Sequence, residues 1–199
     1  MKAMRFFSMI FLAGLIGMSN LIASCHSMPG GIRGDGNVLK ETRKVGSFTG
    51  IDVSGAFKIV IKQGATEEVV VEADANLLPI IRTDVVGSTL RIDTKKSVSN
   101  PTTMKVYVTV KDLSDIDVSG AVDIVSDGML TLNELKIDAS GASDSDLELS
   151  VKRLGLDCSG ASKMKFRGTA GTVEMDLSGA SDIFAYDFVA ETYNMEISG

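Results

Sequence analysis

The chain is 199 residues long, and its 44% hydrophobic content is enough to build one packed domain. Its 20 basic and 26 acidic residues give a net charge of −6, which becomes −8 (18 against 26) if residues 1–24 are removed, because these contain two basic and no acidic residues. This excess of acid argues against nucleic acid or anionic lipid as a partner.

Residues 1–24 have the features of a bacterial lipoprotein signal peptide. Lys2 and Arg5 give a positive start, residues 6–18 are apolar, and residues 22–25 read Ile-Ala-Ser-Cys. An aliphatic residue and two small residues before a cysteine resemble a lipobox, in which the cysteine is acylated and becomes the new N-terminus. The sequence therefore predicts a lipid anchor at Cys25. The alternative is ordinary cleavage that leaves a free thiol.

Residues 25–36 follow as a short glycine-rich segment. We interpret them as the lipidated cysteine and a flexible tether, and residues 37–199 as one β domain. If Cys25 carries lipid, Cys158 is the only other cysteine. The sequence then predicts no internal disulfide.

Residues 37–111 are rich in β-branched residues but irregular in spacing. Alternation of apolar and polar residues predicts four strands, which turn signals at Gly64, Gly87 and Pro101 separate. The only candidate for a helical turn spans residues 76–81, where Pro79 limits its length. The four predicted strands are residues 57–62, 69–73, 89–93 and 104–110.

One pentad of sequence, an acidic residue followed by a small or aliphatic residue and Ser-Gly-Ala, occurs five times, and a sixth, shortened copy ends the chain. The first two glycines are 65 residues apart, and the later ones follow at 21, 19, 19 and 20 residues. The long interval is explained either by longer coils or by an insertion of paired strands. We expect the first pentad to stack continuously with the later ones. Because the chain stops inside the sixth copy, we also expect the natural protein to continue. The repeated positions are Asp52, Ser54, Gly55, Asp117, Ser119, Gly120, Asp138, Ser140, Gly141, Asp157, Ser159, Gly160, Asp176, Ser178 and Gly179.

The spacing of the pentads predicts an all-β fold of stacked coils. A unit of about 20 residues cannot bury its own apolar face and needs neighbours on both sides. Apolar residues flank each acid, as Ile116 and Val118 flank Asp117, and this alternation is typical of a strand with one buried face. Stacking would place two apolar columns inside and the Asp and Ser columns outside. Cys158 falls in an apolar column and is interpreted as a small hydrophobic residue.

The row of acids needs compensation, because unit charges about 4.8 Å apart repel one another. The first interpretation is local: backbone N–H groups and serine hydroxyls donate hydrogen bonds to the carboxylates. The second is a row of calcium ions, since oxygen ligands suit calcium. The pentads lack the Gly-Gly-x-Gly-x-Asp spacing of calcium-binding solenoids. We therefore expect no metal and no other cofactor.

The chain resembles a known family in several stretches. They are the lipobox, the opening at residues 36–38, residues 45–55, 61–64 and 71–78, and the repeated Ser-Gly-Ala-Ser. These are similar to the head GIN-domain family, described as putative auto-transporter adhesins and common in Bacteroidota. The resemblance covers about residues 36–199 and implies a right-handed parallel β-helix and an envelope location. Relatives run on for several more coils, which this chain lacks.

Three classes of function remain open: a binding or adhesion module, an envelope scaffold, and a polysaccharide-processing enzyme. Fold alone does not choose among them. The enzyme is disfavoured, because the acids recur identically instead of forming one specialised pair, and the only histidine, His26, lies in the tether. We therefore expect a non-enzymatic, adhesin-like lipoprotein with no catalytic residues. It would be anchored in the outer membrane, facing either side, with a surface polymer or protein as partner and self-association as a further option.

Overall fold

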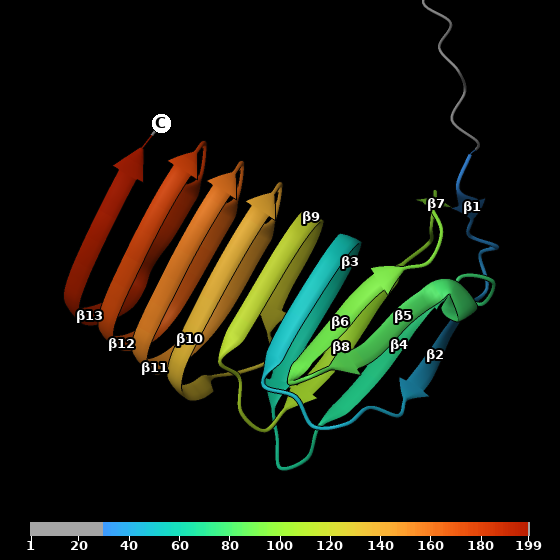
Figure 1. The fold of residues 1–199 in the computed structure, drawn as a ribbon, viewed down its shortest axis with the longest axis horizontal. Helices are drawn as coiled ribbons and strands as arrows, with labels where there is room; N and C mark the ends of the chain where they lie inside the picture. The colour runs from blue at the N-terminus through green and yellow to red at the C-terminus, as the bar shows by residue number, and fades with distance from the viewer. Residues whose placement is uncertain (1–29, 199) are drawn as a thin grey trace, which may run out of the picture.

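The structure is a computed structural model that describes residues 30–198. The predicted signal peptide and Cys25 lie outside the described residues. Regular structure is almost entirely β, as predicted, and within residues 30–198 no helix is long and apolar enough to cross a bilayer. The elements (Figure 1) are β1 (Ile32–Arg33), β2 (Val38–Arg43), β3 (Gly50–Gln63), β4 (Glu68–Asp74), the 3₁₀ turn η1 (Leu78–Ile80), β5 (Ile81–Val86), β6 (Thr89–Thr94), β7 (Val98–Ser99), β8 (Met104–Val110), β9 (Asp115–Ser126), β10 (Leu130–Gly141), β11 (Asp144–Gly160), β12 (Lys163–Gly179) and β13 (Asp182–Ser198).

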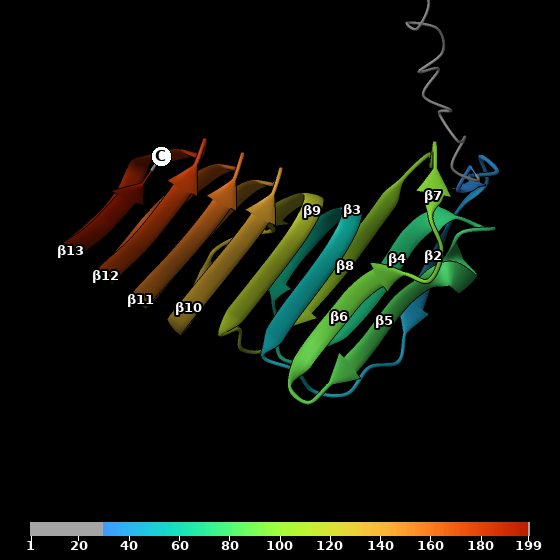
Figure 2. The ribbon, with the colours of Figure 1, turned by 45° about the horizontal axis from the view of Figure 1, so that its top comes forward.

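Strand β3 belongs to both layers of the fold. Its first residues, Gly50 to Val53, pair with β6, and its last residues, Lys58 to Gln63, pair with β8. Strands β6 and β5 extend one layer, and β8, β4 and β2 extend the other (Figure 2). The chain bends at Gly55, whose φ is +114°, a conformation that glycine adopts without strain.

The predicted fold class, a right-handed parallel β-helix or solenoid, is wrong. The main sheet is mixed, because β2 pairs with β4, β4 with β8, and β5 with β6 in antiparallel orientation. With their neighbours these strands form two layers around a common core, so the fold is sandwich-like. The hairpin β5–β6 turns at Gly87, and only antiparallel neighbours can be joined by so short a connection. The 65-residue interval between the first two pentads therefore holds folded-back strands and not longer coils.

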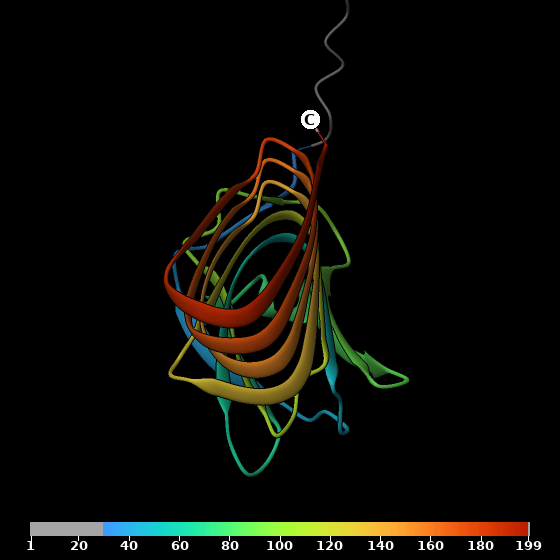
Figure 3. The ribbon, with the colours of Figure 1, turned by 90° about the vertical axis from the view of Figure 1, so that its left-hand side faces the viewer.

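Strands β9 to β13 extend the sandwich by parallel pairing. Ile51 lies opposite Ile116, and Ile116 opposite Ile137, so that the pentads are in register. These side chains are at most 2% exposed and form one apolar column of the core. In the end-on view of Figure 3 the successive turns of the chain lie over one another. At β13 the column reaches solvent: Met195 is 59% exposed, whereas Met175 beside it is 6% exposed.

The structure places part of the predicted tether against the domain. Strand β1 pairs with β7, and the backbone N–H of Gly36 donates a hydrogen bond of 2.7 Å to Oδ1 of Asp74, a fully buried carboxylate at the end of β4. Gly34 passes so close that a Cβ there would lie 2.6 Å from Asp74 Oδ2. Residues 31–37 are thus held by the domain and do not act as a free linker.

The elements predicted between residues 57 and 110 are confirmed. The four expected strands lie within β3, β4, β6 and β8, and the expected helical turn is η1, with Pro79 in it. Strands β2 and β5 were not predicted. Strand β2 is largely exposed, and β5 buries Ile81 and Thr83 but has the sequence Ile-Arg-Thr-Asp-Val-Val, so neither shows the alternation of apolar and polar residues that identifies a half-buried strand.

Candidate functional site

The acidic residue of each pentad lies opposite that of the next. Asp52 faces Asp117, which faces Asp138 on the other side. At the usual strand spacing of about 4.8 Å, two such charges repel by about 1 kcal/mol in water and roughly 3.5 kcal/mol at the effective dielectric of a protein surface. The acidic row consists of Asp52, Asp117, Asp138, Asp157, Asp176 and Glu196.

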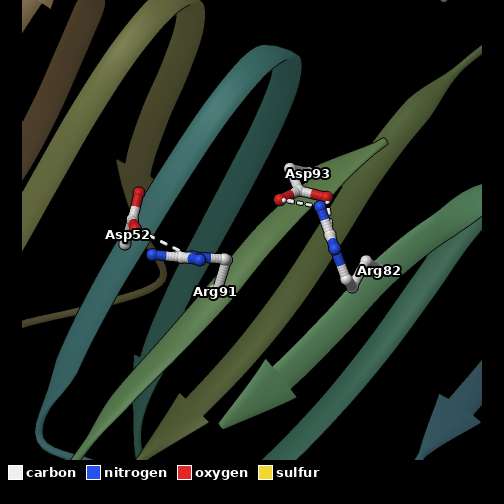
Figure 4. A network of polar contacts seen from close by, with 4 residues as sticks. All are labelled: Asp52, Arg82, Arg91 and Asp93. Atoms are coloured by element: carbon white, nitrogen blue, oxygen red, sulfur yellow. Dashed lines mark hydrogen bonds and ion pairs between the residues drawn. The ribbon is translucent and has the colours of Figure 1, made fainter. Parts of the chain in front are cut away.

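Two basic side chains offset part of this repulsion. Arg91 on β6 lies opposite Asp52, and its Nε is 3.2 Å from Asp52 Oδ2 (Figure 4). Lys136 Nζ is 2.9 Å from Asp138 Oδ2. The negative charge of the acidic row is therefore partly neutralised at two places, by Arg91 at the end nearest β6 and by Lys136 beside Asp138. The expected compensation was by local hydrogen bonds to the carboxylates, whereas these cations come from another strand or from outside the pentad and follow from no motif.

Asp117 lies between two other members of the acidic row. Burial raises the pKa of its carboxyl above the ordinary value, and the neighbouring charges of Asp52 and Asp138 raise it further, while Lys136 opposes them. Asp117 is thus harder to ionise than an ordinary aspartic acid. The row as a whole is a surface of high negative charge.

The pentad serines are also in register, and the hydroxyls of two of them, Ser140 and Ser178, bond to the backbone of the preceding turn. Ser140 Oγ donates to the carbonyl oxygen of Val118 at 3.3 Å, and Ser178 Oγ donates to that of Cys158 at 3.4 Å. Each hydroxyl therefore ties one turn to the preceding one. The sequence analysis had expected such hydroxyls to donate to the acids. A hydroxyl that donates to a carbonyl is also poorly placed to act as a nucleophile.

The pentad glycines let adjacent turns approach closely. Gly141 has a φ of +106°, and a Cβ on it would lie 2.6 Å from the carbonyl oxygen of Gly120. Across the same corner the N–H of Ala142 donates to that carbonyl at 2.9 Å. A side chain at this corner would separate the turns and break their backbone hydrogen bond.

Cys158 is buried in an apolar column, as expected. Burial first, and then Asp157 and Asp138, raise the pKa of its thiol to about 11, so that it is a thiol at neutral pH. Its Sγ lies 3.5 Å from the sulfur of Met164. Among the described residues no group of three or more His, Cys, Asp and Glu side chains is arranged to hold a metal ion.

A polar groove of about 530 Å³ lies where β3 and β8 end beside β10 and β11. The amide of Gln63 bonds both backbone groups of Thr131, donating to its oxygen at 3.0 Å and accepting from its N–H at 2.9 Å. Lys111, Asn133 and Lys152 line the groove around it. No pattern in the sequence predicts this groove, because its residues come from four strands or strand ends and share no motif.

A family model described as "Putative auto-transporter adhesin, head GIN domain" matches residues 47–199. The chain belongs to the head GIN-domain family. The resemblance found in the sequence is thereby confirmed. No curated protein is similar enough in sequence to match this GIN-domain chain.

Solved structures share the GIN-domain fold. An adhesin candidate from Bacteroides fragilis has a TM-score of 0.80 at 24% identity, over 85% of this chain and 80% of that one. A candidate lipid-binding protein from Parabacteroides distasonis has a TM-score of 0.63 at 20% identity, over 83% and 80%. An adhesin candidate from Parabacteroides merdae has a TM-score of 0.61 at 17% identity, over 84% and 80%. At these identities the likeness establishes the fold, which is the sandwich-like GIN-domain fold and not a parallel β-helix.

Proposed function

We propose that this GIN-domain protein is a non-enzymatic, adhesin-like lipoprotein of the cell envelope that binds a repeating polymer or a protein through its acidic row. The register of the pentads carries the proposal. Because the pentads are in register, their carboxylates recur at the constant spacing of neighbouring strands. Backbone and serine hydrogen bonds hold the successive turns together. A repeating ligand can engage several such positions at once, so that weak contacts add to a strong one.

The arrangement of the serines and acids favours binding over catalysis. The serine hydroxyls of β10 and β12 are engaged with backbone carbonyls. The members of the row on either side of Asp117 are acids at equivalent positions of the neighbouring pentads, so no single pair of carboxylates is set apart from the others. Membership of a family described as adhesins supports the same conclusion.

The proposal is tested by screening the full chain on arrays of glycans and extracellular-matrix proteins. The double variant Asp138→Asn/Asp157→Asn removes two adjacent charges of the acidic row. Asp144→Asn/Asp182→Asn removes two exposed charges elsewhere and is the matched control. We expect the first variant to lose at least about tenfold in affinity for the ligand and the control to keep it. Equal loss in both variants, or an array without any ligand, would contradict the proposal.

Lipid anchoring is proposed at Cys25, on the strength of the lipobox-like residues 22–25. Cys25→Ala should move the protein from the membrane fraction to the soluble fraction, and retention in the membrane fraction would count against the anchor. Proteolysis of whole cells then tells which side of the outer membrane the domain faces. Crosslinking in cells distinguishes an adhesin from an envelope scaffold, since a scaffold would crosslink to other envelope proteins or to its own copies and bind nothing on the array.

A further inference from the structure

A cationic cleft lies at the end of the sandwich that is farthest from β13 along the sheet. It is bounded by the end of β2, by η1 and β5, and by the segment that follows β6, and it has a volume of about 280 Å³. Four basic residues line it, Arg43, Lys44, Arg82 and Lys95, against one acidic residue, Asp84. This balance is the reverse of that of the whole chain, which carries a net charge of −6.

The two arginines are fixed in orientation. Arg82 donates from Nε and Nη2 to the two oxygens of Asp93, both at 2.7 Å (Figure 4). Its Nη1 takes no part in this paired contact. Arg43 Nη2 donates to the carbonyl oxygen of Leu78 at 2.7 Å, and its Nε is buried with no hydrogen-bond partner among the described residues. Because that Nε is shielded from solvent, it offers no hydrogen bond to a ligand, and Arg43 contributes to the cleft through its positive charge.

The two lysines supply the excess charge. Glu41 lies 3.4 Å from Arg43 Nη1, and Asp93 pairs with Arg82, so each arginine already has a carboxylate beside it. Neither Lys44 nor Lys95 takes part in any ion pair of residues 30–198. The backbone N–H of Lys95 donates to Ile80 at 2.9 Å, which fixes the base of this side chain at the cleft.

From these contacts we propose that the cationic cleft binds a phosphate monoester. A dianion with three terminal oxygens can accept hydrogen bonds from the fixed guanidinium groups while the lysines neutralise its charge. The cleft is several times the volume of one water molecule, about 30 Å³ in the liquid, so that it admits the phosphate and part of the group that carries it. This site is separate from the acidic row, and its ligand does not depend on the proposed adhesion.

The same phosphate monoester could come from a soluble compound or from a lipid headgroup, and two sets of probes distinguish these sources. The soluble probes are inorganic phosphate and glucose 6-phosphate, with glucose and with sodium chloride of equal ionic strength as controls. They are titrated into the full chain in a mild non-ionic detergent, with binding followed by amide chemical shifts and by melting temperature. We expect saturable binding of both phosphates, weakening as salt increases, and none of glucose.

Three variants assign the binding to the cationic cleft. Lys44→Gln/Lys95→Gln should weaken phosphate binding by about tenfold or more, because it removes the two unpaired charges. Asp84→Asn should strengthen binding, because it removes the opposing carboxylate. Lys163→Gln/Lys165→Gln changes the net charge by the same amount far from the cleft and should leave the affinity unchanged. All of the lysines are exposed, so we expect the variants to fold and to melt at wild-type temperatures.

The lipid source is tested by flotation with phosphatidylcholine vesicles that contain or lack phosphatidic acid. An acylated Cys25 would bind both kinds of vesicle equally, so the difference in flotation between the two compositions reports only on phosphatidic acid. Extra flotation on phosphatidic acid that the Lys44→Gln/Lys95→Gln variant loses supports the site with a lipid ligand. Binding of glucose 6-phosphate without extra flotation supports it with a soluble ligand. The proposal is overturned if neither probe binds, or if the two double-lysine variants lose binding equally.

Discussion

Thr102 donates two hydrogen bonds to the carboxylate of Asp74, one from its backbone N–H to Oδ2 and one from its hydroxyl to Oδ1, both at 2.7 Å. The N–H of Gly36 donates to the same carboxylate, so that Asp74 joins the N-terminal segment, β4 and the loop before β8. Burial alone would raise the pKa of Asp74. The hydrogen bonds from Thr102, Gly36 and Thr103 outweigh it, and the pKa is lowered.

Asp74→Asn should destabilise the domain and reduce its sensitivity to acid. A lowered folded-state pKa means that the ionised carboxylate contributes stability above its unfolded value, about 3.9, and loses this contribution as the pH falls through the folded-state pKa. Urea unfolding at neutral pH should therefore separate wild type from Asp74→Asn, and the two curves should converge below about pH 4. The exposed control Asp144→Asn should follow wild type throughout. A constant difference between wild type and Asp74→Asn at all pH values would contradict the assignment.

Gly141→Ala should be more damaging than Gly87→Ala. Both glycines have positive φ, and an alanine there costs roughly 1–2 kcal/mol from the backbone alone. At Gly87 no atom lies within 4 Å of the added Cβ, whereas at Gly141 the carbonyl oxygen of Gly120 lies 2.6 Å from it. We expect a loss of about 1 kcal/mol at Gly87 and of more than about 2 kcal/mol at Gly141, measured by chemical unfolding. Equal losses would show that the close approach of the turns is unimportant.

Ser143 and Ser162 should be coupled. Both are buried, and their hydroxyl oxygens are 3.1 Å apart. Replacing one serine by alanine leaves the other hydroxyl without this partner, which costs about 1–3 kcal/mol, while replacing both removes the problem. A double-mutant cycle in urea should therefore give a coupling energy of about 1 kcal/mol, with the double variant more stable than the sum of the single changes predicts. Strict additivity would mean that the two hydroxyls do not interact.

The pKa of Asp117 should respond to its neighbours in the acidic row. Since Asp52 and Asp138 both raise it, Asp52→Asn and Asp138→Asn should each lower it, and Lys136→Gln should raise it further. Side-chain carboxyl NMR at low salt measures the change directly. In Asp182→Asn the titration of Asp117 should be unchanged. In the Asp52→Asn/Asp138→Asn double variant the pKa of Asp117 should still lie above its ordinary value, because burial is the largest cause of its rise.

Local sequence was enough to predict the repeated part of the molecule but not the part that precedes it. The register of the pentads follows from their spacing, because strand pairing in one phase buries Ile116, Ile137 and Leu156 together. Strands β2 and β5 give no such pattern, since they lie at the edges of the layers and their apolar and polar residues do not alternate. Because these strands pair in antiparallel orientation, the fold is sandwich-like and not the predicted stack of coils.

The charged sites were beyond the reach of motif analysis for a different reason. The cationic cleft joins Arg43, Arg82 and Lys95, which are separated by 39 and 13 residues and belong to no repeat. Arg91 meets Asp52 only because β6 pairs with β3. Such contacts depend on which strands become neighbours, and this choice was the part of the topology that the sequence analysis had wrong.

Strands β11 and β12 are matched residue for residue, with Asp157 opposite Asp176 and Gly160 opposite Gly179. Each 19-residue unit therefore ends in the geometry in which the next one starts. Unequal recombination within the gene could duplicate or excise such a unit without disturbing the antiparallel half. Descendants would then differ in length by whole turns, which gives selection a simple way to adjust how far the domain extends while the antiparallel strands stay the same.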